Sequence, residues 1–212
     1  MMQRSAPLRL RHRQHANPLA IRGPVAVPNW LAVYGRQAPM ALDIGCGTGQ
    51  FLLELARRNP AWNVLGLDIR PHLIAAVNQQ AAALGLPNAH AVFANANAHL
   101  EDLVADKSVA FVSVNFPDPC YKRRHHKRRV VQSGWVQLLA KKLTPQAQVH
   151  VMTDYQPIAM QIRNLLQDLV GMKNCDGLNA FSEQSTTGIV SEREIKHMRR
   201  NESIYRMRFA YM

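Results

Sequence analysis

The chain has 212 residues, 47% of them hydrophobic and 19% charged, which suits one domain with a core of its own and argues against a largely disordered chain. It contains no apolar run of about 18 residues, and its basic N-terminal stretch has no apolar segment before a cleavage site, so we expect neither a membrane span nor a secretory signal. The three scattered cysteines, Cys46, Cys120 and Cys175, indicate neither a disulfide framework nor a metal site, and a reducing cytoplasm suits them best.

The excess positive charge, a net +12, is confined to two stretches. Residues 1–42 contain six Arg and no acid, and Lys122–Arg129 contains six further Lys or Arg and two His. Subtracting these 12 cations from the total of 26 leaves 14, which equals the 14 acidic residues. Such concentration favours a polyanionic partner, RNA or DNA, over a surface that only keeps the protein soluble. We therefore expect a basic and flexible arm over 1–25 and one folded domain over 26–212.

Apolar residues along the chain alternate between strand and helix patterns from residue 40 onward. The predicted strands cover 40–44, 62–67, 89–94, 109–114, 148–153 and 204–211. Apolar residues at helical spacing predict helices at 51–56, 74–84, 131–143 and 158–169. Strands that alternate with helices form βαβ units, so we predict an α/β, Rossmann-like fold with a mostly parallel sheet, helices on both faces and an antiparallel last strand.

Polar residues stand at or just past the carboxyl ends of five predicted strands. They are Asp43, Asp68, Asn95, Asp118 and Asp154. In parallel sheets of this kind ligands bind at that edge, so we expect these side chains to line one site.

The segment between the first strand and the first helix is rich in glycine. Its glycines are Gly45, Gly47 and Gly49, and they follow Asp43. They permit a tight turn and close backbone approach to a ligand at a helix start. A dinucleotide fingerprint needs glycine at the sixth position, which is Gln50 here. The spacing resembles instead the S-adenosylmethionine loop of class I methyltransferases. Asp68 could then accept both ribose hydroxyls, and Asn95 could either bond an adenine edge or be a turn residue that caps the third strand.

Asp118 is bracketed by Pro117 and Pro119 and comes directly before the basic block Lys122–Arg129. The prolines stiffen the loop, and an oriented acid beside a cationic patch suits chemistry on a nucleobase whose phosphates are held. A guanine N7 has a lone pair and no proton, so it can attack a sulfonium methyl directly, and the protein has to supply positioning and electrostatics. Asp154 is a second candidate for that role, and the alternative for Asp118 is a cap on the next turn or helix.

Together these motifs resemble those of the bacterial tRNA (guanine-N7-)-methyltransferases over nearly the whole chain. The matching segments are Arg11–Leu19, Asp43–Gly49, Phe116–Arg129, Thr153–Tyr155, Ser191–Glu194 and Ile204–Arg206. The resemblance implies a class I fold with a seven-stranded sheet and an enzyme that transfers a methyl group from S-adenosylmethionine to N7 of a guanine in the tRNA variable loop. Its partner would be tRNA, with no membrane and no metal, and both a monomer and a homodimer remain open.

The resemblance also assigns roles to individual residues. The implied cofactor residues are Asp43, Gly45, Gly47, Gly49, Asp68, Asn95 and Asp118. The implied substrate residues are Lys122, Asp154, Ser191 and Glu194. Asp118 is also where the catalytic acid of the family falls. Cys120 stands where the family commonly has Trp, so Tyr121 is the candidate for a stacking surface.

Two alternative functions remain open. The chain could methylate another RNA base or a small molecule, or it could bind RNA on the same scaffold without catalysis.

The spacing of Ser191 and Glu194 also fits a helix capping box, which is compatible with a role near the target base. The block Lys122–Arg129 is expected to contact phosphates. Its two histidines, His125 and His126, lack the partners of a metal site and are interpreted as polar members of this patch.

Overall fold

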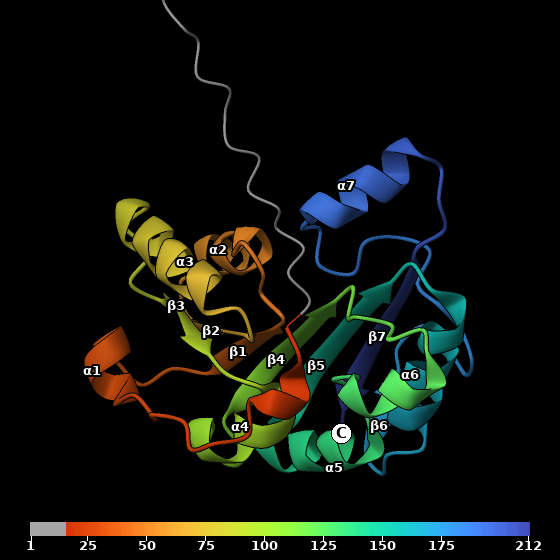
Figure 1. Ribbon diagram of the computed structural model, residues 1–212, viewed down its shortest axis with the longest axis horizontal. Helices are drawn as coiled ribbons and strands as arrows, with labels where there is room; N and C mark the ends of the chain where they lie inside the picture. The colour runs from red at the N-terminus through yellow and green to blue at the C-terminus, as the bar shows by residue number, and fades with distance from the viewer. Residues whose placement is uncertain (1–15) are drawn as a thin grey trace, which may run out of the picture.

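The computed structural model describes residues 16–212, and its centre is one seven-stranded sheet (Figure 1). The strands are β1 (Met40–Ile44), β2 (Asn63–Asp68), β3 (Ala89–Phe93), β4 (Val109–Asn115), β5 (Leu143–Thr153), β6 (Met172–Asn174) and β7 (Tyr205–Tyr211). Their order is β3-β2-β1-β4-β5-β7-β6; the first five are parallel, and β7 runs antiparallel to both of its neighbours. The predicted fold class and the antiparallel last strand are confirmed.

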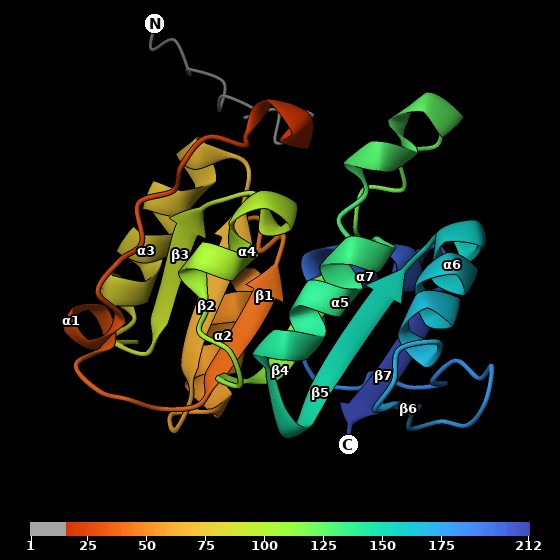
Figure 2. The ribbon, with the colours of Figure 1, turned by 90° about the horizontal axis from the view of Figure 1, so that it is seen from below.

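Helices cover both faces of the sheet. They are α1 (Trp30–Tyr34), α2 (Gln50–Arg58), α3 (Pro71–Ala83), α4 (Ala96–Leu103), α5 (Ser133–Lys142), α6 (Gln156–Gln167) and α7 (Glu192–Arg199), with short 3-10 helices η1 (Pro18–Ala20) and η2 (Arg123–Arg128). In Figure 2, α4, α5 and α6 lie in front of the sheet, whereas α2 and α7 lie behind it. Within residues 16–212, no helix has the length and apolar character needed to span a membrane.

The apolar core consists of two layers, one on each face of the sheet. Leu42, Val112 and Phe209 belong to the layer under α4, α5 and α6. Val64 and Phe111 belong to the layer under α2 and α3. Because both faces are covered, β1 and β2 are buried along their whole length, which explains why the parallel strands are so apolar in sequence.

The structure adds helices α1 and α7, which no apolar pattern predicted, and differs from the predicted elements in three further places. Helix α4 was not predicted, because its buried face contains Ala96 and His99 and has few large apolar residues. The edge strand β6 has only three residues, too few for a pattern. Strand β5 begins at Leu143, and the register with β4 shifts between Leu143 and Gln148. Pro145 lies in this irregular stretch, where a missing N–H is tolerated.

The site edge of the sheet contains the switch in strand order. β2 and β3 extend to one side of β1, whereas β4 and β5 extend to the other. Loops that follow β1 and β4 therefore diverge and leave room between them, which is where such sheets bind ligands. Of the predicted arm, residues 1–15 lie outside the described part of the chain, so its flexibility is not tested. Residues 16–25 belong to the described part, and their backbone carbonyls at Pro18, Ile21 and Gly23 contact side chains at the start of α4.

Candidate active site

The glycine loop between β1 and α2 has left-handed backbone at Gly45, Gly47 and Gly49. A Cβ at Gly49 would lie 2.8 Å from Cγ1 of Val77, so α3 approaches the loop closely only because this residue is glycine. At Gly45, a Cβ would have no atom within 4 Å. The loop therefore has open space on the side of Gly45, next to the start of α2, where backbone amides favour a polar ligand.

Asp43 lies near the end of β1, directly before this loop, and is only 1% exposed. Its Oδ1 accepts hydrogen bonds from Ser113 Oγ at 2.8 Å and from Asn115 Nδ2 at 3.4 Å. Burial raises the pKa of Asp43 to about 7, the two hydrogen bonds oppose that rise, and the nearby charge of Asp68 adds to it. A cation placed over the loop would favour the ionised carboxylate.

Asp68, at the end of β2, has both carboxylate oxygens engaged. Oδ1 accepts from the backbone N of Arg70 at 3.0 Å and from its Nε at 2.8 Å. Oδ2 accepts from Gly47 N at 2.9 Å and from Arg70 Nη2 at 2.7 Å. A carboxylate has about four acceptor sites, so the guanidinium of Arg70 stands where another hydroxyl donor would bind. The bond to Gly47 connects the acid with the glycine loop.

Asn95 caps α4 and also binds residues near the start of the described chain. Its Oδ1 accepts from Asn97 N at 3.1 Å, and its Nδ2 donates to the carbonyls of Pro18 at 2.8 Å and Ile21 at 3.1 Å. His99 Nε2 lies 2.9 Å from the Gly23 carbonyl. Asn95 thus caps helix α4 rather than the third strand, and its amide is directed to residues 18–21.

Asp118 is exposed on a tightly constrained loop after β4. The backbone at Phe116 and Cys120 is left-handed, with φ of 50° and 47°, which is uncommon for residues other than glycine. Asp118 Oδ1 accepts from Cys120 N at 2.9 Å, which closes the turn. The backbone N of Phe116 donates to Met152 O at 2.7 Å and so fixes the loop to the end of β5.

The basic block forms η2, with Lys122, Arg123, Arg124 and Lys127 exposed. Arg129 differs from these residues because it is buried, at 6% exposed. Its Nε donates to Pro119 O at 2.9 Å, and its Nη1 donates to Gln161 on α6. The expectation that the whole block contacts phosphates is therefore wrong for Arg129. This guanidinium supports the loop of Asp118 from below.

Helix α7 brings a second set of side chains to Asp154 and to the Asp118 loop. Asp154 Oδ2 accepts from Arg193 Nη2 at 2.8 Å and lies 3.1 Å from His197 Nε2. Both side chains also contact Phe116: the His197 ring stacks on it with centroids 5.6 Å apart, and the Arg193 guanidinium lies 5.2 Å from its centroid. Phe116 therefore joins the loop after β4 to α7.

Ser191 and Glu194 form the predicted capping box at the start of α7. Ser191 Oγ accepts from Glu194 N at 3.2 Å, and Glu194 Oε2 accepts from Ser191 N at 3.3 Å. Glu194 is 1% exposed, and its Oε1 also accepts from Arg206 on β7, at 3.0 Å from Nε and 2.6 Å from Nη2. Both oxygens are thus held inside the protein in this structure.

The structure places most of the predicted site residues at one edge of the sheet. Asp43 and Asp68 join the glycine loop, whereas Asp154 and α7 meet beside Phe116, two residues before Asp118. Lys122 is exposed at the N-cap of η2. Sequence analysis missed Arg70 and His197. Arg70 lies two residues after Asp68, and His197 lies one helical turn after Arg193, so local spacing was the available signal. Among residues 16–212, no group of three or more His, Cys, Asp or Glu is placed to hold a metal.

Two solved structures with the same architecture carry the name of a methyltransferase. The 16S rRNA methyltransferase KamB matches with a TM-score of 0.65 at 17% identity, covering 88% of this chain and 95% of its own. The aminoglycoside resistance methyltransferase NpmB1 matches with a TM-score of 0.56 at 23% identity, covering 91% and 98%. The strand order and the glycine loop therefore define the class I methyltransferase fold.

Sequence relatives identify the family within this fold class. A family described as putative methyltransferase matches residues 37–207. The tRNA (guanine-N(7)-)-methyltransferase of Synechocystis sp. is 36% identical over 93% of this chain and 96% of its own length. The protein of the same name from Microcystis aeruginosa is 38% identical over 95% and 98%. The chain belongs to the tRNA (guanine-N(7)-)-methyltransferase family, as the sequence motifs predicted.

Proposed function

We propose that this protein transfers a methyl group from S-adenosylmethionine to N7 of a guanine in the variable loop of tRNA. The names of its relatives support the reaction and the tRNA substrate. The observation that carries the proposal is the placement of Asp118. Its carboxylate is exposed on a loop that is fixed by two prolines, by the hydrogen bond from Cys120 N and by Arg129. This loop follows β4, the neighbour of β1, so it lies at the same sheet edge as the glycine loop.

The residues around the glycine loop fit the cofactor. S-adenosylmethionine supplies a methyl group on a positively charged sulfur, together with an ammonium group and two ribose hydroxyls. The open space beside Gly45 would admit its polar groups, and the buried carboxylate of Asp43 would favour its positive charge. Asp68 would accept the ribose hydroxyls after Arg70 moves aside, and Asn95, which follows β3, would lie beside the adenine.

For methyl transfer to N7, the protein has to provide mainly orientation and electrostatic stabilisation. The lone pair of guanine N7 forms the new bond to the methyl carbon while the carbon–sulfur bond breaks, so the positive charge moves from sulfur to the guanine ring and no proton is lost. Asp118 would accept hydrogen bonds from N1–H and the exocyclic amine of guanine. Its negative charge would stabilise the ring as it becomes positive, which lowers the barrier.

The exposed cations of η2 would hold the tRNA backbone beside this acid. Lys122, Arg123, Arg124 and Lys127 all belong to a single short helix and its N-cap, which begins four residues after Asp118. Phosphate contacts of this kind fix the position of the RNA and carry no base information. Replacing one of these cations by Ala should reduce the slope of log binding constant against log salt by about one unit.

The proposal is tested with unmodified tRNA, labelled cofactor and mass spectrometry of the digested nucleosides. The wild-type protein should yield 7-methylguanosine, and recovery of a different methylated base would refute the substrate. Asp118→Ala should lower turnover by about 100-fold or more, the usual effect of losing an electrostatic partner of the transition state, while tRNA binding stays near wild type. Asp102→Ala, on the exposed face of α4, serves as the matched control. Turnover of Asp118→Ala equal to that of the control would exclude Asp118 from the mechanism.

A further inference from the structure

Helix α7 has little apolar packing beyond the stack of His197 on Phe116. Of its eight residues only Glu194 is buried. Isolated helices of this length are unstable in water, so α7 depends on contacts with the rest of the protein for its position. Two of these contacts are ionic: Glu194 with Arg206, and Arg193 with Asp154. Another contact lies in the chain that leads into the helix.

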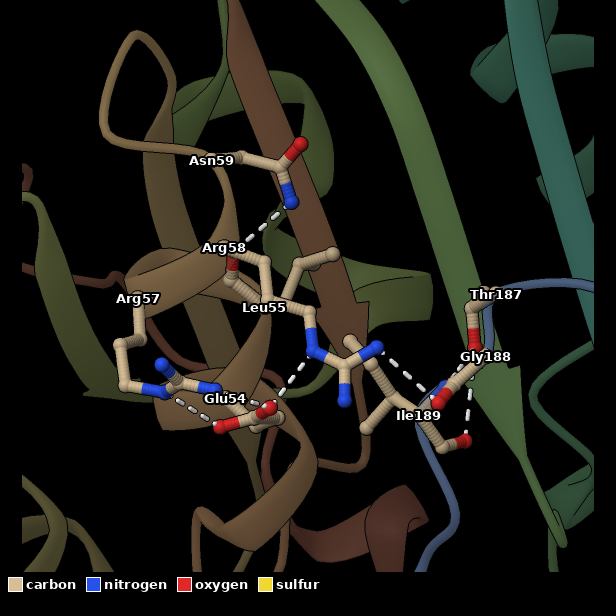
Figure 3. Close-up of polar contacts among 8 residues, drawn as sticks. All are labelled: Glu54, Leu55, Arg57, Arg58, Asn59, Thr187, Gly188 and Ile189. Carbon is tan, nitrogen blue, oxygen red and sulfur yellow. Dashed lines mark hydrogen bonds and ion pairs between the residues drawn. The ribbon is translucent and has the colours of Figure 1, made fainter.

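The segment that precedes α7, residues 187–190, is attached to α2 (Figure 3). Ile189 is 3% exposed and belongs to the apolar cluster formed by α2, α3 and the strands beneath them. Its backbone N donates to Thr187 Oγ1 at 3.1 Å, which keeps the segment in a compact turn. The carbonyl of Gly188, between them, accepts a hydrogen bond from Arg58 Nη1 at 3.0 Å. Ser191, the N-cap of α7, follows two residues after Ile189.

Arg58 is oriented for this contact by Glu54, one helical turn earlier. Glu54 Oε1 accepts from Arg58 Nε at 2.6 Å and from Arg57 Nη2 at 2.8 Å, and its Oε2 accepts from Arg57 Nε at 2.8 Å. These bonds lower the pKa of Glu54 to about 2, so the carboxylate stays charged. The two arginines differ in one respect: both bind Glu54, but only Arg58 reaches the segment before α7 (Figure 3).

Helix α2 thus touches both halves of the site. Its N-cap is Gly49 of the glycine loop, and its last residue, Arg58, holds the chain that enters α7. We propose that Arg58 and Ile189 are positioning residues that anchor α7 to the glycine-loop helix and so set the place of the substrate-side residues Arg193 and Asp154 relative to the cofactor loop. This inference rests on the proposed function only for its effect on catalysis, because the anchor itself is a feature of the free protein.

The test compares Arg58→Ala with Arg57→Ala. Arg57→Ala removes an adjacent cation and its bond to Glu54 but leaves the contact to Gly188, so it is a matched control. In Arg58→Ala we expect the KM for tRNA to rise about fivefold above that of the control, the factor that corresponds to one net hydrogen bond. The KM for S-adenosylmethionine and the Tm should equal those of the control. In hydrogen exchange without ligands, amides of residues 191–199 should exchange faster in Arg58→Ala alone.

The outcomes separate the anchor from the reaction. Equal exchange of α7 in the two variants would overturn the anchor. Faster exchange with an unchanged KM for tRNA would show that the anchor does not position the substrate side. If the KM for tRNA and the KM for S-adenosylmethionine both rise and the Tm falls, Arg58 has only a general structural role. If the wild-type protein makes no 7-methylguanosine, the proposed function fails, and the exchange comparison still decides the anchor.

Discussion

Replacing Asp43 by Asn should stabilise the cofactor-free protein at pH 8 and have little effect near pH 4. Asp43 is buried beneath the glycine loop, and burial raises its pKa from the ordinary value of 3.8 to about 7. Asn has nearly the same shape and no charge. Its Oδ1 can still accept the hydrogen bonds that Ser113 and Asn115 donate to the acid.

The sign follows from the protons bound on each side of the unfolding equilibrium. Between pH 3.8 and about 7, the unfolded chain has released the Asp43 proton while the folded protein still holds it. The free energy of unfolding therefore falls by about 1.4 kcal/mol for each pH unit in this window and is constant above it. The full loss is about 4 kcal/mol, an upper value because the folded protein can relax around the charge. Asp43→Asn avoids this loss.

Urea unfolding of both proteins at several pH values between 4 and 8 measures the difference directly. Groups present in both proteins, such as His150, whose pKa is lowered to about 4 chiefly by burial, cancel in that difference. The advantage of Asp43→Asn should grow from pH 4 to pH 7 and then level off, whereas the exposed control Asp102→Asn should give a difference that does not change with pH. Parallel stability profiles for wild type and Asp43→Asn would refute the raised pKa.

Two further substitutions test the surroundings of the site. Tyr121 is 66% exposed and packs edge-on against Tyr155, with ring centroids 4.9 Å apart. Tyr121→Ala should lower kcat/KM for tRNA about tenfold because one base stack is lost, while Tyr121→Phe should not. Equal kinetics for the two variants would argue against stacking. Arg70→Ala frees the oxygens of Asp68 and should tighten S-adenosylmethionine binding in calorimetry, whereas weaker binding would show that Arg70 itself contacts the cofactor.

The fold could be predicted because its signals are local and repeated. Each parallel strand is a short apolar run, and each intervening helix except α4 has apolar residues at helical spacing. Helix α4 lacks that signal because His99 takes a buried position and bonds to the backbone of Gly23, a contact between segments far apart in sequence. The same limit applies to Pro145, whose place in a register shift of β5 depends on the pairing with β4.

The candidate site divides in the same way. The positions of Asp43, Asp68 and Asp118 follow from strand ends and turns, and sequence spacing alone locates them. Their partners do not follow from spacing. The distinction between Arg129, which is buried under Pro119, and its exposed neighbours in η2 depends on how that block meets α6. Within a run of like charges, sequence offers nothing that separates a structural guanidinium from one that binds phosphate.

The ion pairs of α7 also rank the acids proposed for the target base. Glu194 is buried and bound to Arg206, so turning it toward a base would leave a nearly buried guanidinium without its partner, a change that costs about 3–5 kcal/mol. Asp154 is partly exposed and paired with Arg193, whose side chain is 42% exposed and can be resolvated when the pair opens. Between these two acids, the energetic order therefore favours Asp154 as a contact of the guanine and Glu194 as the residue that holds α7 in place.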